Sequence, residues 1–370
     1  MSSILGPLLF TSLLELAILT AHIILPARTT DGYVRDDKGK PLKYRLQKRP
    51  PRPRSNSPLL DRPLRHSNKA QLKGPPRGSL DEFFLGRALN PRFHVTLAGQ
   101  RRVVDVKMAL YIVGAVHLEL NVLSCVAAHY KISLSSSALP FSPGLLLAAM
   151  LLTWFVSEYL YWENVHLYTY DIFAERIGFK LVWGCMCFYP FFYPIGIIAG
   201  VTLPLTSHHQ SIVYNTFATA VFFSGWGLSR GANLQKYRFK KKQASFSSNS
   251  PPATAENESP TIAKPTQQTS KVIKSQDGTQ VLYCGGLWAI ARHINYVGEV
   301  LEAVGIALAV VGGQSPTTIQ TSLPWLYPLY YVGLLVARER DDDARCKEKY
   351  GKLWDEYCQR VPYRLVPFVY

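Results

Sequence analysis

The feature that most constrains this chain is a series of apolar segments, each near the length that crosses a lipid bilayer. About 20 consecutive apolar residues are needed for a helix to span the hydrocarbon core. The segments that approach this length are 3–26, 106–129, 143–161, 178–203, 210–228, 286–312 and 322–337. The sequence therefore predicts an all-α, polytopic membrane helix bundle of about seven transmembrane segments, with six to nine as the range.

One of these segments carries its own helix breakers. Pro190 and Pro194 lie inside 178–203, and a proline removes a backbone donor and clashes with the preceding turn. Such breaks are tolerated at membrane depth where neighbouring groups satisfy the freed backbone. We therefore expect an interrupted span here.

The positive charge of the chain is unevenly placed. The net charge is +16, and the Lys and Arg residues concentrate at 28–77, at 236–242 and after 337. An even number of predicted spans separates each basic region from the next, so all three fall on one side, which the positive-inside rule identifies as the cytosol. This placement favours a lipid bilayer as the partner of the basic regions, and we expect no nucleic acid.

Composition divides the chain into five parts. Residues 1–27 form the first span, and 28–77 form a basic, Pro-rich linker that is predicted to be disordered. Residues 78–228 are the main membrane bundle. Residues 229–280 are a cytosolic loop, basic at first and then rich in Ser, Pro, Thr and Gln, and 281–370 return to the membrane and end in a cytosolic tail.

The last part is unusually dense in charged and aromatic residues for a membrane protein. GGLWAIARHINYVGE at 285–299 and the tail at 338–370 place them beside apolar segments. Ionisable groups next to hydrocarbon are costly, so such a set indicates a functional site. The alternative is a basic juxtamembrane tail that binds anionic headgroups.

Two further groups suggest specific chemistry. Glu163 and Asp171 lie in the predicted cytosolic turn 163–176, where desolvation would raise the pKa of a carboxyl group and let it donate a proton. Ion pairing at helix ends, such as Glu175 with Arg176, explains them equally well. Lys236 and Lys240 are one helical turn apart and suit the phosphates of a dinucleotide, although positive-inside charge alone explains them too.

Several common sites are not indicated. No G-x-G-x-x-G follows a predicted strand, and there is no P-loop or H-E-x-x-H pattern. Cys185 and Cys187 have no second cysteine or histidine pair at metal spacing, so we expect no metal site. Six scattered cysteines do not indicate a disulfide framework.

Five motifs together resemble one family. They are DEFFLGRALNPR at 81–92, WENVHLYTYDIFAERIGFKLVWG at 162–184, RGANLQKYRF at 230–239, W-x-x-A-R-H-x-N-Y-x-G-E at 288–299, and D-x-x-x-C-x-x-K-Y-G-x-x-W-x-x-Y at 342–357. In this order they resemble the sterol double-bond reductases, which include the sterol C-14, C-7 and C-24(28) reductases and the sterol-reductase-like domain of lamin B receptor.

The resemblance implies an NADPH site on the cytosolic side of the C-terminal half, with the sterol held by the 78–228 bundle. Tyr193 is the first choice for the proton donor, with Asp342, Glu163 and Asp171 as alternatives. The residues that the resemblance implies for NADPH are Lys236, Lys240, Tyr283, Trp288, Asn295, Tyr296, Arg338, Asp342, Cys346, Lys349, Tyr350 and Tyr357.

The chain departs from the family pattern at named positions. Lys240 stands where arginine is usual, Tyr283 where leucine is usual, and Asp341 where arginine is usual. The last change reverses a charge that we expect inside the pocket. Members of the family usually have further membrane spans before the first motif, whereas this chain has one predicted span there.

The resemblance therefore implies NADPH-dependent reduction of a sterol carbon–carbon double bond, in a multi-pass protein of the endoplasmic reticulum membrane. The ending KLWDEYCQRVPYRLVPFVY favours C-14, while C-7 and C-24(28) stay open. A membrane methyltransferase of the isoprenylcysteine type shares an R-H-x-x-Y element and is one alternative. A non-enzymatic protein like lamin B receptor is another, supported by 28–77 and Asp341. Nothing in the sequence indicates an oligomeric state.

Overall fold

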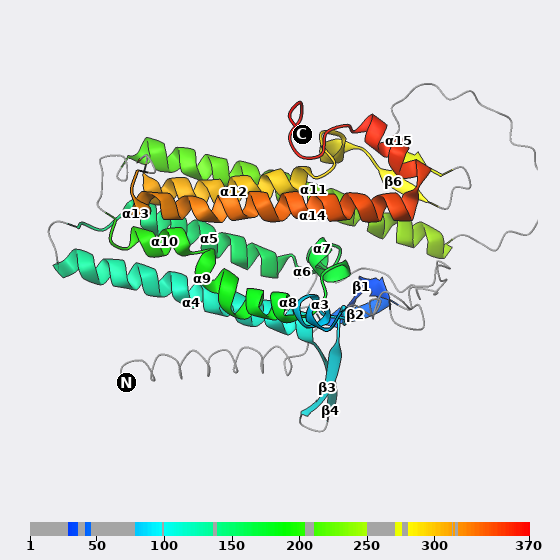
Figure 1. Cartoon of the computed structure of the whole chain (residues 1–370), viewed down its shortest axis with the longest axis horizontal. Coiled ribbons are helices and arrows are strands. Elements are labelled where there is room, and N and C mark those ends of the chain that lie inside the picture. The colour runs from blue at the N-terminus through cyan, green and yellow to red at the C-terminus, as the bar shows by residue number, and fades with distance from the viewer. Residues whose placement is uncertain are drawn as a thin grey trace, which may run out of the picture. The chain divides into compact units, whose positions relative to one another are not determined.

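The computed structural model describes residues 29–35, 41–45, 78–97, 100–135, 139–203, 211–249, 271–275, 280–312, 314 and 317–370. These residues are mostly helical, which confirms the predicted fold class (Figure 1). The predicted first span 3–26 lies outside the described residues, as does most of the linker 28–77. Within that linker, β1 (Thr29–Arg35) and β2 (Pro41–Arg45) pair as antiparallel strands.

The remaining elements follow in chain order. The first group is α3 (Ser79–Leu85), β3 (Arg92–Leu97), β4 (Gln100–Asp105), α4 (Val106–Ser135), α5 (Pro143–Tyr161), α6 (Glu163–His166), α7 (Tyr170–Phe173), α8 (Phe179–Trp183), the π-helix η1 (Gly184–Phe188), α9 (Tyr189–Phe192) and α10 (Ile195–Gly200). The second group is α11 (Ile212–Asn249), β5 (Val272–Lys274), β6 (Val281–Tyr283), the 3-10 helix η2 (Gly286–Ala289), α12 (Ile294–Val311), α13 (Ile319–Ser322), the 3-10 helix η3 (Leu323–Trp325), α14 (Leu326–Tyr350) and α15 (Lys352–Arg360).

Four helical stretches in the described part of the chain are long and apolar enough to cross a membrane. They are Val106–Ser135, Pro143–Tyr161, Phe179–Gly200 and Ile294–Val311. They coincide with four predicted spans, although the last helix begins at Ile294, eight residues after the predicted start at 286. The predicted spans 210–228 and 322–337 lie within α11 and the η3–α14 region, which are not among the four.

The predicted interruption of the span Phe179–Gly200 is present. The chain changes there from α8 to the π-helix η1, then to α9 and α10, with Pro190 in the first turn of α9 and Pro194 directly before α10. The amide of Asn121 on α4 donates a hydrogen bond of 2.9 Å to the Pro190 carbonyl. A neighbouring side chain therefore satisfies a backbone group at the break, as membrane depth requires.

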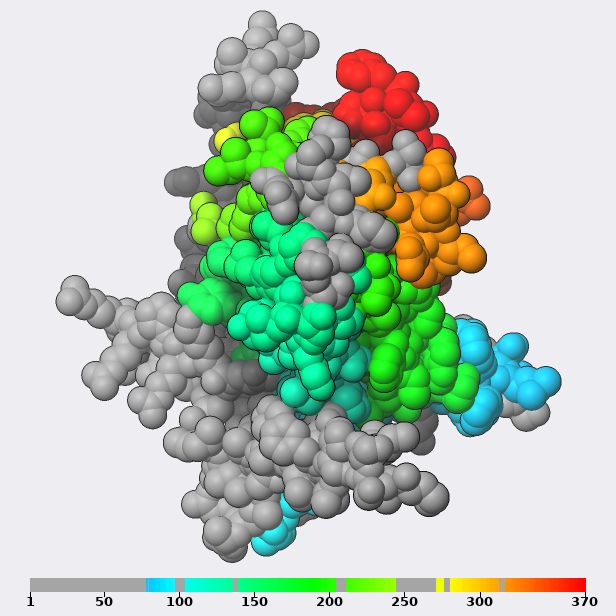
Figure 2. Space-filling model, turned by 90° about the vertical axis from the view of Figure 1, so that its left-hand side faces the viewer, coloured from blue at the N-terminus to red at the C-terminus, as the bar shows by residue number. Residues whose placement is uncertain are grey.

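The chain divides into two compact units, and each is described by itself. The first unit comprises Met1–Arg54, Arg65–Phe223 and Leu301–Tyr331. Its helices pack closely: a Cβ on Gly144 of α5 would lie 2.4 Å from the Ala309 carbonyl oxygen of α12, so only glycine permits this approach. α5 is also in contact with α10, and Figure 2 shows blue-green residues of the α4–α5 region beside bright green residues of the interrupted span.

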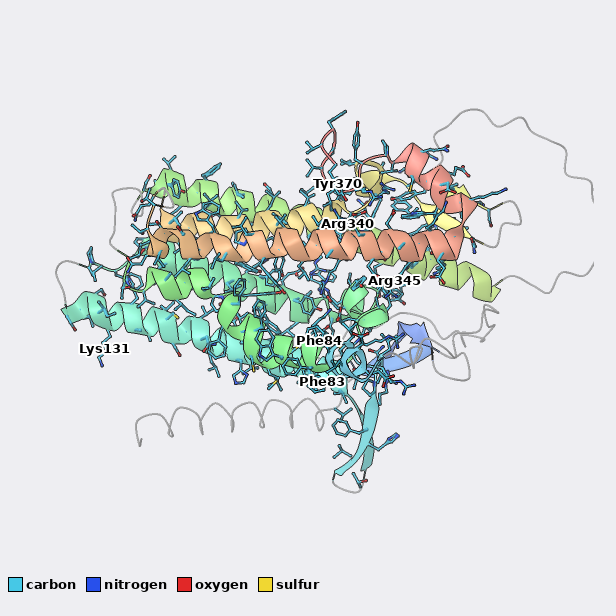
Figure 3. The ribbon with its side chains drawn as sticks, in the orientation of Figure 1. Phe83, Phe84, Lys131, Arg340, Arg345 and Tyr370 are labelled. Atoms are coloured by element: carbon cyan, nitrogen blue, oxygen red, sulfur yellow. The ribbon has the colours of Figure 1, made fainter. Side chains whose placement is uncertain are left out.

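The segment that begins at α3 is fastened to the turn before α8. Phe83, labelled in Figure 3, stacks on Phe179 with ring centroids 5.3 Å apart. Gly86, which follows α3, has φ +78°, and a Cβ there would lie 2.0 Å from the Ile177 carbonyl oxygen. Ile177 in turn donates its amide to the Ala88 carbonyl at 2.8 Å. The LGRALN part of the first motif thus packs against another stretch of backbone.

The second unit comprises Ser55–Leu64, Ser224–Val300 and Val332–Tyr370. It holds the later part of α11, the β5–β6 hairpin, η2, the start of α12, most of α14, and α15. A buried cluster of Ile273, Cys284, Leu353, Trp354 and Tyr357 joins the hairpin to α15. Burial of these large side chains is the main stabilising contribution in this unit.

Gly86 offers a direct test of the contact between α3 and the turn before α8. Alanine at 86 would have to take a backbone conformation that only glycine adopts readily and would clash with the Ile177 carbonyl. We expect Gly86→Ala to destabilise the protein by roughly 2–4 kcal/mol, measured as a lower thermal midpoint in detergent. The control is Gly333→Ala, where a Cβ meets nothing within 4 Å; equal midpoints for the two variants would contradict the contact.

Candidate functional site

All the residues predicted to hold a dinucleotide lie in the second unit. They come from six elements that are far apart in the sequence. Lys236 and Lys240 are on α11, Tyr283 on β6, Trp288 on η2, Asn295 and Tyr296 on α12, Arg338, Asp342, Cys346, Lys349 and Tyr350 on α14, and Tyr357 on α15.

Trp288 is fixed by the motif on α11. Its indole Nε1 donates a hydrogen bond of 2.8 Å to the Ala232 carbonyl, and the Leu287 amide donates to Gln235 Oε1 at 3.0 Å. Lys236 lies over the indole ring, with Nζ 5.2 Å from the ring centroid, a cation–π geometry. The N-L-Q-K motif therefore holds the G-L-W turn and places a cation against its aromatic ring.

His293 lies next to Asp342. The histidine Nδ1 is 4.0 Å from the Asp342 Oδ2, and the imidazole stacks on the Tyr296 ring with centroids 5.2 Å apart at 17°. His293 and Tyr296 are both buried. The start of α12 and the middle of α14 thus meet through an imidazole and a carboxylate.

Burial decides the charge of His293. Desolvation lowers the pKa of its imidazole to about 4, with Lys236 and Arg292 acting in the same direction and Asp342 and Asp343 opposing them. The ring is therefore neutral near pH 7, even beside the Asp342 carboxylate. A neutral imidazole has one N–H donor and one lone-pair acceptor.

Lys236 and Asp342 lie near the same two side chains. Both act electrostatically on His293 and on the thiol of Cys346. Burial, together with the Asp342 carboxylate, raises the pKa of Cys346 to about 12, although the nearby lysines Lys236 and Lys240 act in the opposite direction. The cysteine is therefore a protonated thiol that packs against the hydrophobic cluster. Lys236 and Lys240 of α11 and Asp342 of α14 all act on this thiol, so the two helices lie near each other here.

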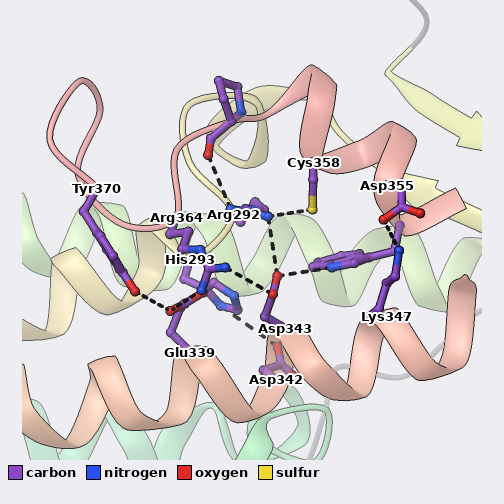
Figure 4. Close-up of polar contacts among 12 residues, drawn as sticks. Arg292, His293, Glu339, Asp342, Asp343, Lys347, Asp355, Cys358, Arg364 and Tyr370 are labelled. Carbon is purple, nitrogen blue, oxygen red and sulfur yellow. Dashed lines mark hydrogen bonds and ion pairs between the residues drawn. The ribbon is translucent and has the colours of Figure 1, made fainter. Parts of the chain in front are cut away.

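An ion-pair network holds the C-terminal tail against the segment before α12 (Figure 4). Glu339, on α14 and fully buried, accepts hydrogen bonds from Arg364 Nη1 at 3.1 and 3.4 Å and from the Tyr370 hydroxyl at 3.4 Å. Asp343 accepts from Arg292 at 3.4 Å, from Arg364 at 3.4 Å and from the Trp354 indole at 3.1 Å. Two arginines from different segments thus converge on two acids of one helix.

Backbone hydrogen bonds complete this attachment. The amide of Arg292 donates to the Tyr363 carbonyl at 3.0 Å, and that of His293 donates to the Arg364 carbonyl at 2.9 Å. The His293 main chain is therefore held directly by the tail.

Three consecutive aspartates on α14 point to different partners. Successive helical residues are about 100° apart, so neighbours in the sequence face different ways. Asp341 pairs with Arg345 at 2.6 Å and is exposed, Asp342 faces His293, and Asp343 joins the network. The expectation that Asp341 reverses a charge inside the pocket stays a prediction; its side chain is 44% exposed.

Sequence reasoning missed Glu339 and Asp343 as parts of the site. Their signal is a four-residue spacing on α14 that puts both on one face, while Asp342 and Cys346 share the next. The arginines that pair with these two acids, Arg292 and Arg364, lie in separate segments. Only the folded chain reveals that pairing.

The other candidate proton donors belong to the first unit. Tyr193 lies between α9 and α10, and its ring contacts those of Tyr189, Tyr327 and Tyr331 with centroids 5.4, 4.6 and 5.5 Å away. Each of these neighbours is also a tyrosine. Tyr193 is therefore part of a phenol-rich cluster at the interruption of the span Phe179–Gly200.

Glu163 is buried at the start of α6. It lines a small cavity of about 10 Å³ together with Tyr111, Tyr159 and His166. This space suits about one water molecule, and its lining is largely apolar. A carboxyl group here has the apolar surroundings that the sequence predicted for it.

Asp171 lies on α7, whose end is held by a buried lysine. Lys107 on α4 donates hydrogen bonds to the carbonyls of Asp171 at 2.9 Å, Ile172 at 3.4 Å and Glu175 at 2.7 Å. A cation at a helix C-terminus satisfies carbonyls that have no partner within the helix. Lys107 therefore fixes the path of the acidic turn.

The comparison with known families decides the classification. The pattern of the ergosterol biosynthesis ERG4/ERG24 family matches residues 64–370. The chain belongs to this family. The match includes all five motifs and both units, so an isoprenylcysteine-type methyltransferase is no longer an alternative reading of the R-H-x-x-Y element.

Curated relatives of this family member are named as reductases. The delta(14)-sterol reductase of Arabidopsis thaliana is 30% identical over 306 residues, which cover 82% of this chain and 70% of the relative. The delta(14)-sterol reductase TM7SF2 of Mus musculus is 31% identical over 304 residues, covering 80% and 61%. The delta(14)-sterol reductase ERG24 of Saccharomyces cerevisiae is 29% identical over 300 residues, covering 81% and 58%.

The match covers only part of the length of each relative. This chain spans between 58% and 70% of the length of these three proteins. The activity in their names fits a nicotinamide cofactor. Family membership and the four apolar helices together identify a membrane protein.

The buried neutral His293 predicts how stability depends on pH. In the unfolded chain the imidazole pKa is about 6.5, whereas in the folded chain it is about 4. Between these values the unfolded state binds more protons, so stability is complete above pH 6.5 and falls as pH drops toward 4, by roughly 3 kcal/mol. We expect the thermal midpoint of the wild type to fall over this range by more than that of His293→Gln; parallel curves would contradict the assignment.

The Arg364–Glu339 pair predicts a second effect on stability. Arg364→Met leaves the fully buried Glu339 carboxylate without its main partner, so we expect a loss of about 2 kcal/mol. The added change Glu339→Gln should recover part of that loss. The control is Lys347→Met, which removes an exposed ion pair with Asp355 and should cost less than about 1 kcal/mol. An equal loss of thermal midpoint in the two single variants would contradict a buried network.

Proposed function

We propose that this chain is an NADPH-dependent sterol reductase that saturates the C-14 double bond of a sterol. The observation that carries the proposal is the meeting, within one unit, of the α11 lysines, the Trp288 ring and the His293–Asp342 pair. The names of the relatives support the same reaction and the same double bond. C-7 and C-24(28) are the competing positions.

The residues of the second unit fit a dinucleotide. Lysines on one face of α11 match phosphate groups, and two of them, Lys236 and Lys240, give charge for a 2′-phosphate as well as the pyrophosphate. Trp288 and Tyr296 offer flat apolar surfaces for a base or a nicotinamide ring. Two buried polar atoms, His293 Nε2 and Asn295 Oδ1, have no hydrogen-bond partner among the described residues, as expected of groups that bind a ligand.

The chemistry requires an acid as well as a hydride. An isolated sterol double bond is not electrophilic, so it must first accept a proton and form a tertiary carbocation on the sterol. When bound, NADPH supplies the hydride that reduces this carbon. The task of this chain is to hold the nucleotide, to deliver the proton, and to keep water from the cation.

Four residues are candidates for delivering the proton. Tyr193 is the first choice because it sits in a phenol-rich cluster at the break in a membrane span. Asp342 is the alternative in the second unit, and Glu163 and Asp171 are the alternatives in the acidic turn. A protonated phenol or carboxyl group can act as a general acid in such surroundings.

We further propose that the protein works as a multi-pass protein of the endoplasmic reticulum membrane. The basic regions that the structure describes, on α11 and in the tail, belong to the second unit, and the positive-inside rule assigns them to the cytosol. NADPH would then enter from the cytosol, while the sterol would enter from the bilayer.

The test is reduction by membranes that contain the expressed protein. With NADPH and sterols unsaturated at C-14, C-7 or C-24(28), we expect loss of the C-14 double bond, seen by mass spectrometry as a gain of two hydrogens. Asp342→Asn should lower the rate by at least about ten-fold, because the carboxylate faces His293 at the site. Asp341→Asn, one residue away and paired with Arg345 on the exposed side, should stay near the wild type.

Each other outcome has a clear meaning. Reduction only at C-7 or C-24(28) would keep the reductase and correct the position. No reduction of any of the three sterols by a well-folded protein would contradict the proposed function. Equal rates for the two aspartate variants would remove Asp342 from the site.

A further inference from the structure

His293 has a nitrogen that nothing in the described part of the second unit satisfies. Its Nε2 is buried and accepts or donates no hydrogen bond there. The residue as a whole is only 4% exposed, so solvent does not take the place of a partner. Buried polar atoms are almost always paired, and an exception at a candidate site indicates a group that waits for a ligand.

The other side of the ring is already committed. Nδ1 faces the Asp342 carboxylate at 4.0 Å, the ring plane is stacked on Tyr296, and the main-chain amide is bonded to the Arg364 carbonyl. A carboxylate is an acceptor only, so it favours the tautomer with the hydrogen on Nδ1. Nε2 then carries a bare lone pair and acts as an acceptor.

The surrounding charges agree with a neutral ring. The charged groups that act on His293 are Asp342 and Asp343 of α14, Lys236 of α11, and the adjacent Arg292. The two carboxylates and the two cations act in opposite directions, desolvation is the largest cause, and burial holds the imidazole pKa near 4. At physiological pH the ring therefore offers an acceptor at Nε2.

We propose that His293 is a further residue of the nucleotide site, and that its Nε2 accepts a hydrogen bond from an amide or hydroxyl hydrogen of the bound nicotinamide nucleotide. This inference rests on the proposed cofactor. It adds a role for the histidine beside Asn295 and Tyr296, which the family resemblance already implies. Nearby, Asn295 Oδ1 is a second buried polar atom with no partner in the described part of the chain, and it gives the same segment a second acceptor.

Two substitutions separate the two ring nitrogens. In His293→Asn the amide nitrogen lies close to the position of Nδ1, which keeps a donor toward Asp342 but leaves nothing at Nε2. In His293→Gln the side chain is one methylene longer, and its amide oxygen reaches the region of Nε2 and can accept. Comparing the two variants therefore separates the effect of losing the acceptor at Nε2 from the effect of losing the donor toward Asp342.

The measurement is the Kd of NADPH for the purified full chain in detergent, without sterol, followed by calorimetry or by tryptophan fluorescence. We expect His293→Asn to weaken binding about ten-fold and His293→Gln to stay within about three-fold of the wild type. Thermal midpoints recorded for the same samples show that each variant is folded.

Every other pattern overturns the assignment. Wild-type affinity in His293→Asn would mean that Nε2 makes no contact, and equal losses in both variants would mean that the ring only packs. If the wild type binds NADPH and either of these patterns appears, the histidine proposal fails while the proposed function stands. If the wild type binds no nicotinamide nucleotide, the proposed function fails and the histidine proposal fails with it.

A measurement on the unsubstituted chain covers the case in which both variants misfold. With ¹⁵N in its histidine rings, the buried bare Nε2 of His293 gives a resonance typical of an unprotonated, unbonded nitrogen. Saturating NADPH should move this resonance toward the range of a hydrogen-bonded acceptor. A resonance that stays in place while NADPH binds would overturn the proposal.

Discussion

The candidate site depends on two acids on one face of α14, Glu339, which is fully buried, and Asp343, which is partly buried. Glu339 and Asp343 receive Arg364 from the tail, and Asp343 also receives Arg292 from the segment before α12. A buried carboxylate is costly unless it is paired, so these contacts stabilise one arrangement of the three segments strongly over others. That arrangement holds the His293 main chain against the tail and presents its ring to Asp342 on the neighbouring face of the same helix. The structural and the candidate functional acids therefore alternate along a single helix.

In the first unit, too, a charged side chain from one segment satisfies polar groups of another. Its acidic turn would otherwise leave carbonyls without partners beside apolar surroundings, and Lys107 from α4 satisfies three of them. The residues after this turn are held by Gly86 and Ala88, whose backbones are in close contact with the backbone of Ile177. The LGRALN motif thus has a structural role in this chain. Tyr193 lies elsewhere in this unit, at the break in a membrane span, where Asn121 satisfies the Pro190 carbonyl.

The sequence predicted the features that depend on residues close together in the chain. Apolar runs located four helices of membrane length, Pro190 and Pro194 located the interrupted one, and the spacing of Lys236 and Lys240 predicted that they share a helix. The start of α12 was predicted too early, because hydropathy does not distinguish the apolar η2 turn from the helix that follows it. The Arg292–Asp343 and Arg364–Glu339 pairs could not be predicted, since their partners are 51 and 25 residues apart and charge alone does not choose among many candidates. The role of Asp341 in the pocket stays a prediction: it pairs with Arg345, whereas Asp342, one position along the helix, faces His293.

The central claim is that the last third of the chain builds one site for a nicotinamide nucleotide from α11, α12 and α14. The most direct test is a density map of the purified protein with NADPH at saturating concentration, determined by electron cryomicroscopy in a lipid nanodisc. The account predicts nucleotide density in contact with Lys236, Trp288 and Asp342. Density bound elsewhere, with these three side chains touching only protein, would contradict it.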